Sequence, residues 1–187
     1  TGFYNPKARV PLRVLDHHAE NFDEASLDAR MEAALDLRLD TLRLNEISDA
    51  WRVIHSDGDG LSGLVVDRYD DVLSIEVTTL GIWKRLPRWL PRLHERLGTK
   101  QQAIHLDPDI ARIEGMRYAD VPEAEGEPPR SVRVREHGVR YLVNFEDGHK
   151  TGFFCDQREN RVRFAKLARG RRVLDLCTYT GGFALAA

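Results

Sequence analysis

Ten residues near the end of the chain, LDLCTYTGGF at positions 174–183, have the types and spacing of a cofactor-binding turn. Asp175 follows an apolar run, and its carboxylate can accept hydrogen bonds from a cationic amine. Gly181 and Gly182 let a ligand approach the backbone, and the helix expected next offers free N–H groups. The stretch has neither the GxGxxG spacing of a dinucleotide site nor the Lys-Ser/Thr pair of a phosphate loop. It therefore favours a nucleotide-like cofactor, with a plain strand–helix turn as the alternative.

A second polar segment, GHKTGFFCDQRENR at positions 148–161, combines basic and aromatic side chains. The residues are Lys150, Arg158 and Arg161 with Phe153 and Phe154. Such a mixture suits an RNA backbone together with an unstacked base. The structural alternative stays open, because phenylalanines usually pack in a core and the arginines can be solvated helix positions.

The two cysteines, Cys155 and Cys177, do not stand in a metal-binding or catalytic pattern. Together with the irregularly spaced His137 and His149 they do not give the ligand spacing of a zinc site. Cys177 lies close to an expected helix N-terminus, which lowers a thiol pKa, but no acid–base partner is evident. We interpret both cysteines as structural and expect no metal.

Composition limits the class of protein. The chain has 187 residues, 42% of them hydrophobic, and a formal net charge of −2. Its apolar runs are too short to span a membrane, its N-terminus has no signal-peptide core, and two cysteines form no disulfide framework. We expect a cytoplasmic protein without a membrane partner. Residues 131–187 hold 11 Lys and Arg against 6 Asp and Glu, a surplus of +5, which indicates either an anionic partner or a solvated helix face.

The first two thirds of the chain predict a small α/β unit. Residues 8–15 alternate like a strand, whose partner strands we expect to be missing. Asn21 and Glu24 fit a capping box before a helix over 23–39. Strands near 51–55, 64–69 and 71–79, separated by Gly and Asp turns, indicate an antiparallel meander. The remaining elements are a helix over 83–97 that starts near Pro87, a strand over 103–107 and a Pro- and Glu-rich linker over 121–130.

The last third predicts the opening of a βαβ unit. Two strands flank a His137-Gly138 turn. The DQRE sequence predicts Asp156 as the N-cap of a helix that runs to about Ala168 and closes at Gly170. An apolar strand over 171–176 and a helix start then complete the pattern, so the fold class is α/β.

Four segments, GFYNPKARVPLRVL, RVIHSDGDGLSGLVVDRY, GHKTGFFCDQRENR and VLDLCTYTGGFALAA, occur in an order that resembles one family. It is the large-subunit ribosomal RNA methyltransferase I family, whose members use S-adenosylmethionine (SAM) to form 5-methylcytosine in 23S rRNA. The resemblance implies that 1–15 is the tail of a PUA-type RNA-binding domain and that 16–130 is a central α/β domain. Residues 131–187 then start a Rossmann-like catalytic domain that is incomplete here, and the chain is expected to be cut at both ends.

The resemblance also implies site residues. The SAM-binding motif matches Asp175, Thr178, Tyr179, Thr180, Gly181 and Gly182. A second signature, expected to border the SAM and RNA-base pocket, matches Lys150, Thr151, Gly152, Phe153, Phe154, Asp156, Gln157 and Arg158. Lys150, Arg158 and Arg161 are the expected RNA contacts. The cysteine that attacks cytosine C6 in this family is expected beyond Ala187, so neither Cys155 nor Cys177 takes that role.

The implied mechanism is base flipping, thiolate attack on C6 and methyl transfer from SAM to C5. The implied partner is 23S rRNA, with a homodimer as a further expectation. We expect these 187 residues to be inactive alone, and the residues beyond about Arg171 to need another chain, a swapped segment or further sequence. The competing hypothesis is a non-catalytic RNA-binding or scaffolding module.

Overall fold

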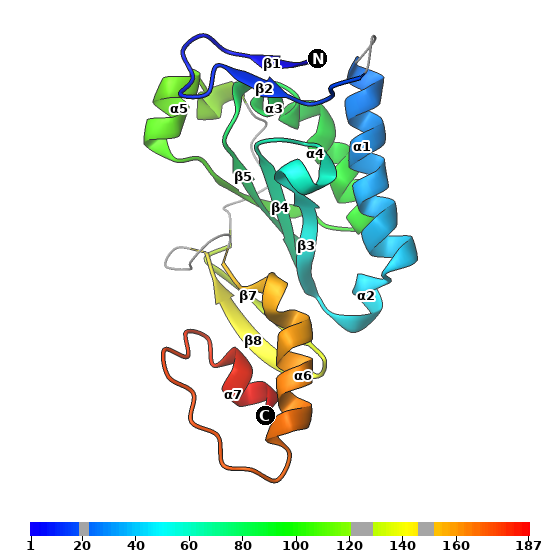
Figure 1. The fold of residues 1–187 in the computed structure, drawn as a ribbon, viewed down its shortest axis with the longest axis vertical. Helices are drawn as coiled ribbons and strands as arrows, with labels where there is room; N and C mark the ends of the chain where they lie inside the picture. The colour runs from blue at the N-terminus through cyan, green and yellow to red at the C-terminus, as the bar shows by residue number, and fades with distance from the viewer. Residues whose placement is uncertain (19–22, 121–128, 146–151) are drawn as a thin grey trace.

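The computed structural model describes residues 1–18, 23–120, 129–145 and 152–187. A four-stranded sheet with its helices forms one part, and a hairpin with two helices forms the other, below it in Figure 1. The two termini lie at opposite ends of this elongated arrangement. No helix within the described ranges is long and apolar enough to cross a membrane.

The sheet is a mixed one with the strand order β3-β4-β5-β6. β3 (Ala50–His55), β4 (Leu64–Tyr69) and β5 (Val72–Val77) are antiparallel neighbours, which confirms the predicted meander. β6 (Gln101–His105) pairs with β5 in parallel and begins two residues before the predicted strand. The parallel pairing follows from the helical crossover between β5 and β6, because a tight hairpin can join only antiparallel strands.

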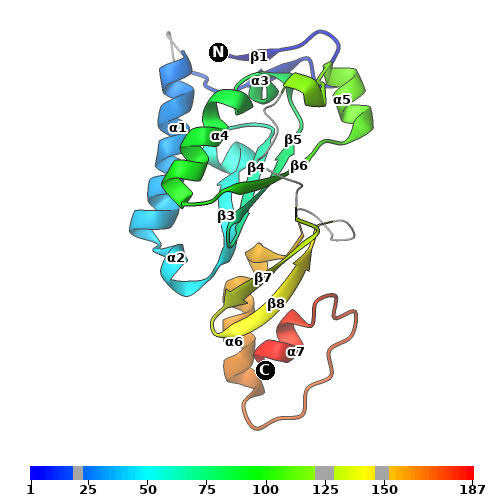
Figure 2. The same cartoon turned by 180° about the vertical axis from the view of Figure 1, so that it is seen from behind.

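Helices α1 (Glu24–Asp36) and α4 (Leu86–Leu97) cover one face of this sheet, in front of it in Figure 2. The predicted helical face of Leu27, Met31, Ala34 and Leu35 is buried, and Pro87 lies in the first turn of α4 as expected. The short helices α2 (Leu44–Ile47) and α3 (Leu80–Trp83) lie in the connections.

The start of α1 differs from the prediction. Its N-cap is Asp23, whose carboxylate accepts the backbone N–H of Ser26 at 2.9 Å, while the Ser26 hydroxyl accepts from the Asp23 backbone. The capping box therefore uses Asp23 and Ser26 rather than Asn21 and Glu24. Asn21 itself lies outside the described residues.

Ion pairs join α1 to α4 along their length. Arg85 and Arg88 pair with Glu24, Arg92 bridges Asp28 and Glu32, and Arg96 reaches Asp36. Asp28 also accepts the Trp89 indole N–H at 2.8 Å. The arginines of this helix surface are thus already committed to carboxylates.

The N-terminal segment has the partner strand that the sequence did not reveal. β1 (Gly2–Tyr4) pairs antiparallel with β2 (Leu12–Val14), so the prediction of missing partners for 8–15 was wrong at this edge. The segment packs on the central part, where the Phe3 ring lies beneath the Arg85 guanidinium at 5.0 Å. Asn5 bonds to the last residue of α5 (Pro108–Glu114).

The C-terminal part begins with the predicted hairpin. β7 (Ser131–Glu136) and β8 (Val139–Asn144) pair antiparallel around His137 and Gly138, whose φ angles of 48° and 86° are those that a tight two-residue hairpin turn requires. The helix α6 (Arg158–Ala168) ends as predicted, with Gly170 at φ 71° just beyond it.

Two predictions for this part are wrong. Asp156 is not a helix cap, because it lies inside a 3₁₀ turn, Cys155–Gln157, and α6 starts after Gln157. Residues 171–176 form no strand, and Leu174 and Leu176 are mostly exposed. A strand needs a backbone partner, and within the described residues no strand lies beside this segment. The chain runs instead as an irregular loop into α7 (Gly182–Ala186).

A second apolar core joins the two parts. Ala50 and Tyr69 of the sheet pack with Val134, Tyr141, Val143, Phe153 and Cys155. Backbone contacts reinforce this junction, since Ser48 bridges Glu136 and the Asp49 N–H donates to the Arg135 carbonyl at 2.8 Å. The hairpin is therefore anchored to the sheet by burial and by hydrogen bonds.

Candidate functional site

The two polar segments singled out in the sequence meet in the C-terminal part. The Tyr179 hydroxyl donates to the Gly152 carbonyl at 3.0 Å, although the two residues are 27 positions apart. The Tyr179 ring also stands edge-on to Phe154, with ring centroids 5.3 Å apart and planes at 89°. This edge-to-face geometry is the favourable one for aromatic pairs. The folded chain thus builds one aromatic corner from both signatures.

The turn before α7 is held by the carboxylate of Asp175. Its Oδ2 accepts the Thr178 hydroxyl at 2.9 Å and the Ala184 backbone N–H, in the first turn of α7, at 3.2 Å. Its Oδ1 has no hydrogen-bond partner within the described ranges, and the side chain is half-buried. Asp175 therefore fixes the turn with one oxygen and keeps the other available to a donor.

The turn before α7 contains left-handed backbone conformations, and only one of them is at a glycine. Cys177, Tyr179 and Gly181 all have left-handed φ angles, of 58°, 51° and 71°. This conformation costs nothing at glycine but about 1 to 2 kcal/mol at other L-residues. The Asp175 and Tyr179 hydrogen bonds offset that cost, because both tie the turn to its surroundings.

The two glycines of the turn have different roles. Gly181 supplies the left-handed residue that precedes α7. Gly182 is buried, and a Cβ at this position would lie 3.2 Å from Cδ of Arg161. The Gly182 carbonyl accepts the Tyr141 hydroxyl at 3.4 Å. Gly182 therefore allows α7 to pack closely against α6, whereas Thr178 is exposed and Thr180 half-buried.

The second signature divides into buried and accessible residues. Phe153 is 1% exposed and packs on Tyr141 in the junction core, while Phe154 is half-buried at the aromatic corner. Asp156 is exposed, and Gln157 and Arg158 are half-buried. The structure thus supports the core alternative for Phe153, whereas the Phe154 ring contacts Tyr179 in the turn before α7.

Arg161 does not fit the predicted RNA contact. Its side chain is 4% exposed and forms a two-bond ion pair with Glu136, at 2.6 Å from Nε to Oε1 and 2.8 Å from Nη2 to Oε2. Both terminal nitrogens also donate to the Phe154 carbonyl at 3.2 Å. The guanidinium therefore links α6 to the hairpin and to the aromatic corner. Lys150 and Thr151 lie outside the described residues.

A signal for this buried pair was present in the sequence. Along β7 the side chains of Val132, Val134 and Glu136 alternate onto one face, so an acid stands at a position expected to be apolar. A buried carboxylate requires a cation, and the basic helix that follows could supply it. That inference needed the pairing of α6 with the hairpin, which local sequence does not give.

The cysteines have structural surroundings. Cys155 is buried in the junction core, and desolvation raises the pKa of its thiol well above the ordinary value. Its Sγ lies 3.8 Å from the Tyr69 hydroxyl. A thiol with a raised pKa is a poor nucleophile at neutral pH. Cys177 is exposed in the turn. Within the described ranges no three His, Cys, Asp or Glu side chains are grouped to hold a metal ion.

Comparison with known proteins adds independent findings. Residues 115–187 match the family described as S-adenosylmethionine-dependent methyltransferase. The whole chain is 32% identical, over 189 residues, to "Ribosomal RNA large subunit methyltransferase I" of Citrobacter koseri and covers 47% of it. It is 37% identical, over 196 residues, to "Ribosomal RNA large subunit methyltransferase" of Deinococcus radiodurans, again covering 47%. The chain thus spans about half the length of the curated relatives it matches.

Two solved structures share the fold. A protein described as "a putative methyltransferase complexed with SAH" aligns over 94% of this chain and 44% of its own, with a TM-score of 0.71. A second, described as "a putative sam-dependent methyltransferase from Streptococcus mutans", aligns over 94% of this chain and 45% of its own, with a TM-score of 0.68. Both are only 20% identical to this chain in sequence, but their structural similarity supports the predicted α/β methyltransferase fold.

Proposed function

Because the chain belongs to the SAM-dependent methyltransferase family that includes ribosomal RNA large subunit methyltransferase I, we propose that the whole protein methylates large-subunit rRNA. The product we propose is 5-methylcytosine in 23S rRNA, formed in the cytoplasm. The observation that carries this proposal is the contact of the two signature segments, through Tyr179 with Gly152 and Phe154. This contact brings the turn that carries Asp175 next to the aromatic ring of Phe154, and a SAM site needs both an acid and aromatic surfaces.

The residues present suit SAM. When bound, SAM supplies an electrophilic methyl group on a sulfonium. Asp175 would accept the cationic amine with Oδ1, the oxygen that the turn does not use. Phe154 and Tyr179 offer aromatic faces to a purine ring, and Gly181 allows backbone approach. The proposed SAM site is completed by Thr178, Thr180, Asp156, Gln157 and Arg158. Gly182 and Phe153 contribute to it through packing.

The proposed division of labour follows the chain. Residues 1–15 belong to an RNA-binding unit of the PUA type, 16–130 to a central unit, and 131–187 to the start of the catalytic unit. Lys150 and Arg158 are the proposed RNA contacts of the catalytic unit, and Arg161 holds the scaffold. Neither cysteine is proposed as the nucleophile, since Cys155 is buried with a raised thiol pKa.

We further propose that the 187 residues alone do not turn over. The chain matches about half of each relative, and the loop over 171–176 leaves Leu174 and Leu176 exposed. Further sequence of a longer protein would cover these side chains. The predicted homodimer has no support from the relatives or from the described part of the chain. A non-catalytic RNA-binding module remains the competing function, favoured if a longer protein also binds no SAM.

The deciding experiment compares the 187-residue chain with a full-length protein. SAM binding is measured by calorimetry, and methyl transfer by incorporation of radiolabelled methyl into unmodified rRNA, followed by nucleoside mass spectrometry. We expect 5-methylcytosine from the full-length protein only. Asp175→Asn should weaken SAM binding, whereas Arg112→Ala, an exposed change on α5, should not. Turnover by the short chain would refute its proposed inactivity, and a different methylated nucleoside would refute the cytosine assignment.

A further inference from the structure

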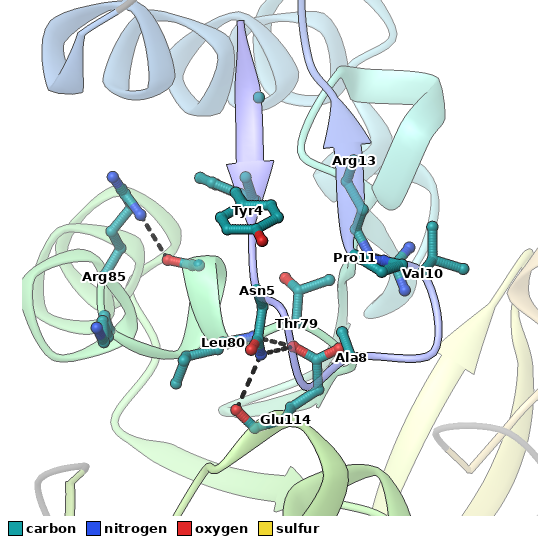
Figure 3. Close-up of a pocket in the computed structure, with 14 residues that line it drawn as sticks. Tyr4, Asn5, Ala8, Val10, Pro11, Arg13, Thr79, Leu80, Arg85 and Glu114 are labelled. Atoms are coloured by element: carbon teal, nitrogen blue, oxygen red, sulfur yellow. Dashed lines mark hydrogen bonds between the residues drawn. The ribbon is translucent and has the colours of Figure 1, made fainter.

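A pocket lies between the N-terminal hairpin and the central part, far from the aromatic corner in the fold. It has a volume of about 290 Å³ and is formed by β1, β2 and their connecting loop on one side, and by α3 and the end of α5 on the other (Figure 3). This volume is close to the lower end of the range for ligand pockets, roughly 300 Å³, so the pocket can hold a group no larger than about one nucleotide. None of its lining residues belongs to the proposed SAM site.

A buried acid forms the floor of the pocket. Glu114 is 6% exposed, and its Oε2 accepts the Asn5 side-chain amide at 2.9 Å and the Leu80 backbone N–H at 3.1 Å. Figure 3 shows these three residues converging in the pocket. Oε1 of the same carboxylate has no hydrogen-bond partner in the part of the chain that the structure describes. The free oxygen of a largely buried carboxylate is a strong acceptor for a ligand N–H group.

Cations without partners line the same pocket. Arg13 is half-buried and Lys84 is exposed, and neither side chain has an ion pair or hydrogen bond within the described ranges. Arg85, also in the lining, is by contrast committed to Glu24 and stacks on Phe3. The connecting loop adds exposed Lys7 and Arg9, and residues 1–15 contain no acid. The unpaired cations therefore favour an anionic ligand.

The pocket also presents an aromatic surface. Tyr4 is 71% exposed although it belongs to β1, and Figure 3 shows its ring beside Asn5 in the pocket wall. Val10, 53% exposed, and Pro11 add apolar surface on the opposite side. An exposed aromatic ring beside cations is the arrangement on which unstacked bases of single-stranded RNA bind.

We propose that this pocket binds one nucleotide of single-stranded RNA. Arg13 and Lys84 contact its phosphate, and the base stacks on Tyr4. Glu114 accepts a hydrogen bond from an exocyclic amino group, which adenine, cytosine and guanine carry and uracil lacks. The choice of RNA as the polymer rests on the proposed function. Paired bases could not enter the pocket, so a duplex is disfavoured.

The test measures binding of fluorescein-labelled ten-nucleotide oligo(A), oligo(C) and oligo(U) to the 187-residue chain by fluorescence anisotropy over a salt series. We expect oligo(A) and oligo(C) to bind more tightly than oligo(U). Tyr4→Ala should weaken binding about fivefold or more, the loss typical of one stacked base. The double variant Arg13→Ala, Lys84→Ala should weaken binding and reduce the salt slope by about 0.7 for each phosphate that is no longer neutralised.

Two further variants make the test specific. Glu114→Gln places an amide donor where the carboxylate accepted, so the preference against oligo(U) should disappear or reverse. Lys100→Ala removes an exposed lysine beyond the far end of α4 and should leave affinity unchanged. Circular dichroism melting confirms that each variant is folded, and the two surface cations carry the test even where Glu114→Gln lowers stability.

The outcomes are separable from those of the proposed function. Wild-type RNA affinity in both the Tyr4 and the double-cation variants would refute RNA binding at this pocket. Losses of affinity no larger than that of Lys100→Ala would refute it equally. Equal binding of all three oligonucleotides would overturn the role of Glu114. If the full-length protein does not methylate rRNA but these variants still change RNA binding as expected, only the proposed function fails. If methyl transfer occurs and the variants bind RNA normally, only the pocket fails.

Discussion

The buried pair Arg161–Glu136 offers the sharpest prediction for how the candidate site is held. Arg161→Met keeps an apolar stem over the Phe153 ring, which lies 4.7 Å from the guanidinium carbon, and removes the charge. Glu136, only 2% exposed, is then left as an uncompensated buried carboxylate. Breaking a buried pair in this way costs about 3 to 5 kcal/mol. The Phe154 carbonyl also loses its two Arg161 donors while it keeps the Gln157 backbone N–H at 3.1 Å, which adds at most about 1 kcal/mol.

Such a loss is large enough to open the C-terminal part selectively. With about 1.4 kcal/mol per tenfold, it raises the open population more than a hundredfold. Native-state hydrogen exchange at the backbone amides of Val134 and Tyr141 reports the hairpin, and urea unfolding followed by tryptophan fluorescence reports the sheet part, which holds all three tryptophans. We expect exchange in the hairpin to accelerate while the tryptophan transition shifts much less.

Two controls test the reasoning behind this magnitude. Arg43→Met breaks an exposed pair, Arg43–Glu46, with side chains 68% and 59% exposed, and should cost less than about 0.5 kcal/mol. The double variant Arg161→Met, Glu136→Met removes both charges and should recover most of the loss. A single-variant cost below about 1 kcal/mol, or a double variant no more stable than the single one, would refute the account of a desolvated ion pair.

Three other changes probe the rest of the molecule. Gly152→Ala places a Cβ 2.7 Å from Cγ1 of Val143 at φ 131°, so it should cost about 1 to 3 kcal/mol in urea unfolding; an unchanged midpoint would contradict the close approach. Burial lowers the pKa of His105, and the nearby Glu76 charge opposes that shift only in part. The unfolded state therefore binds the proton first, and the free energy of unfolding falls as the pH drops below about 6.5. His105→Gln should make the melting temperature less dependent on pH in this range. Desolvation raises the pKa of Asp28, but the hydrogen bonds from Trp89 and Arg92 outweigh it and hold that pKa below its usual value. Asp28→Asn should therefore cost about 1 kcal/mol of folding stability at pH 7. It should also lessen the loss of stability below about pH 4, as measured by urea unfolding at both pH values.

Local sequence predicted the elements whose partners are close in the chain. The β3-β4-β5 meander and the β7-β8 hairpin follow from alternating apolar residues around turn residues, and each strand pairs with its neighbour. The apolar spacing of α4 and its proline start were equally readable, because helix formation depends on residues three and four positions apart. The α/β class and the SAM-family motifs were likewise readable from the amino-acid order alone.

Elements that need distant partners were predicted poorly. Residues 171–176 have the composition of a buried strand, but a parallel strand exists only beside another strand, and none lies next to it in the described residues. Residues 8–15 were expected to lack partners, yet β1 supplies one for β2. The predicted N-caps were also wrong, because α1 uses the neighbouring Asp23 as its cap, and α6 follows a 3₁₀ turn and begins after Gln157 without a side-chain cap.

The sequence by itself determined which residue types the candidate site contains and which family the motifs resemble. Only the tertiary structure decided their roles, because burial and charge pairing depend on what the rest of the chain brings alongside. Arg161 was a plausible RNA contact, but in the folded chain Glu136 accepts from one edge of its guanidinium and the Phe154 carbonyl accepts from the other. Conversely, Tyr4, Arg13, Lys84 and Glu114 gave no shared signal along the chain. They form one pocket because packing of the N-terminal hairpin against α3 and α5 places them together.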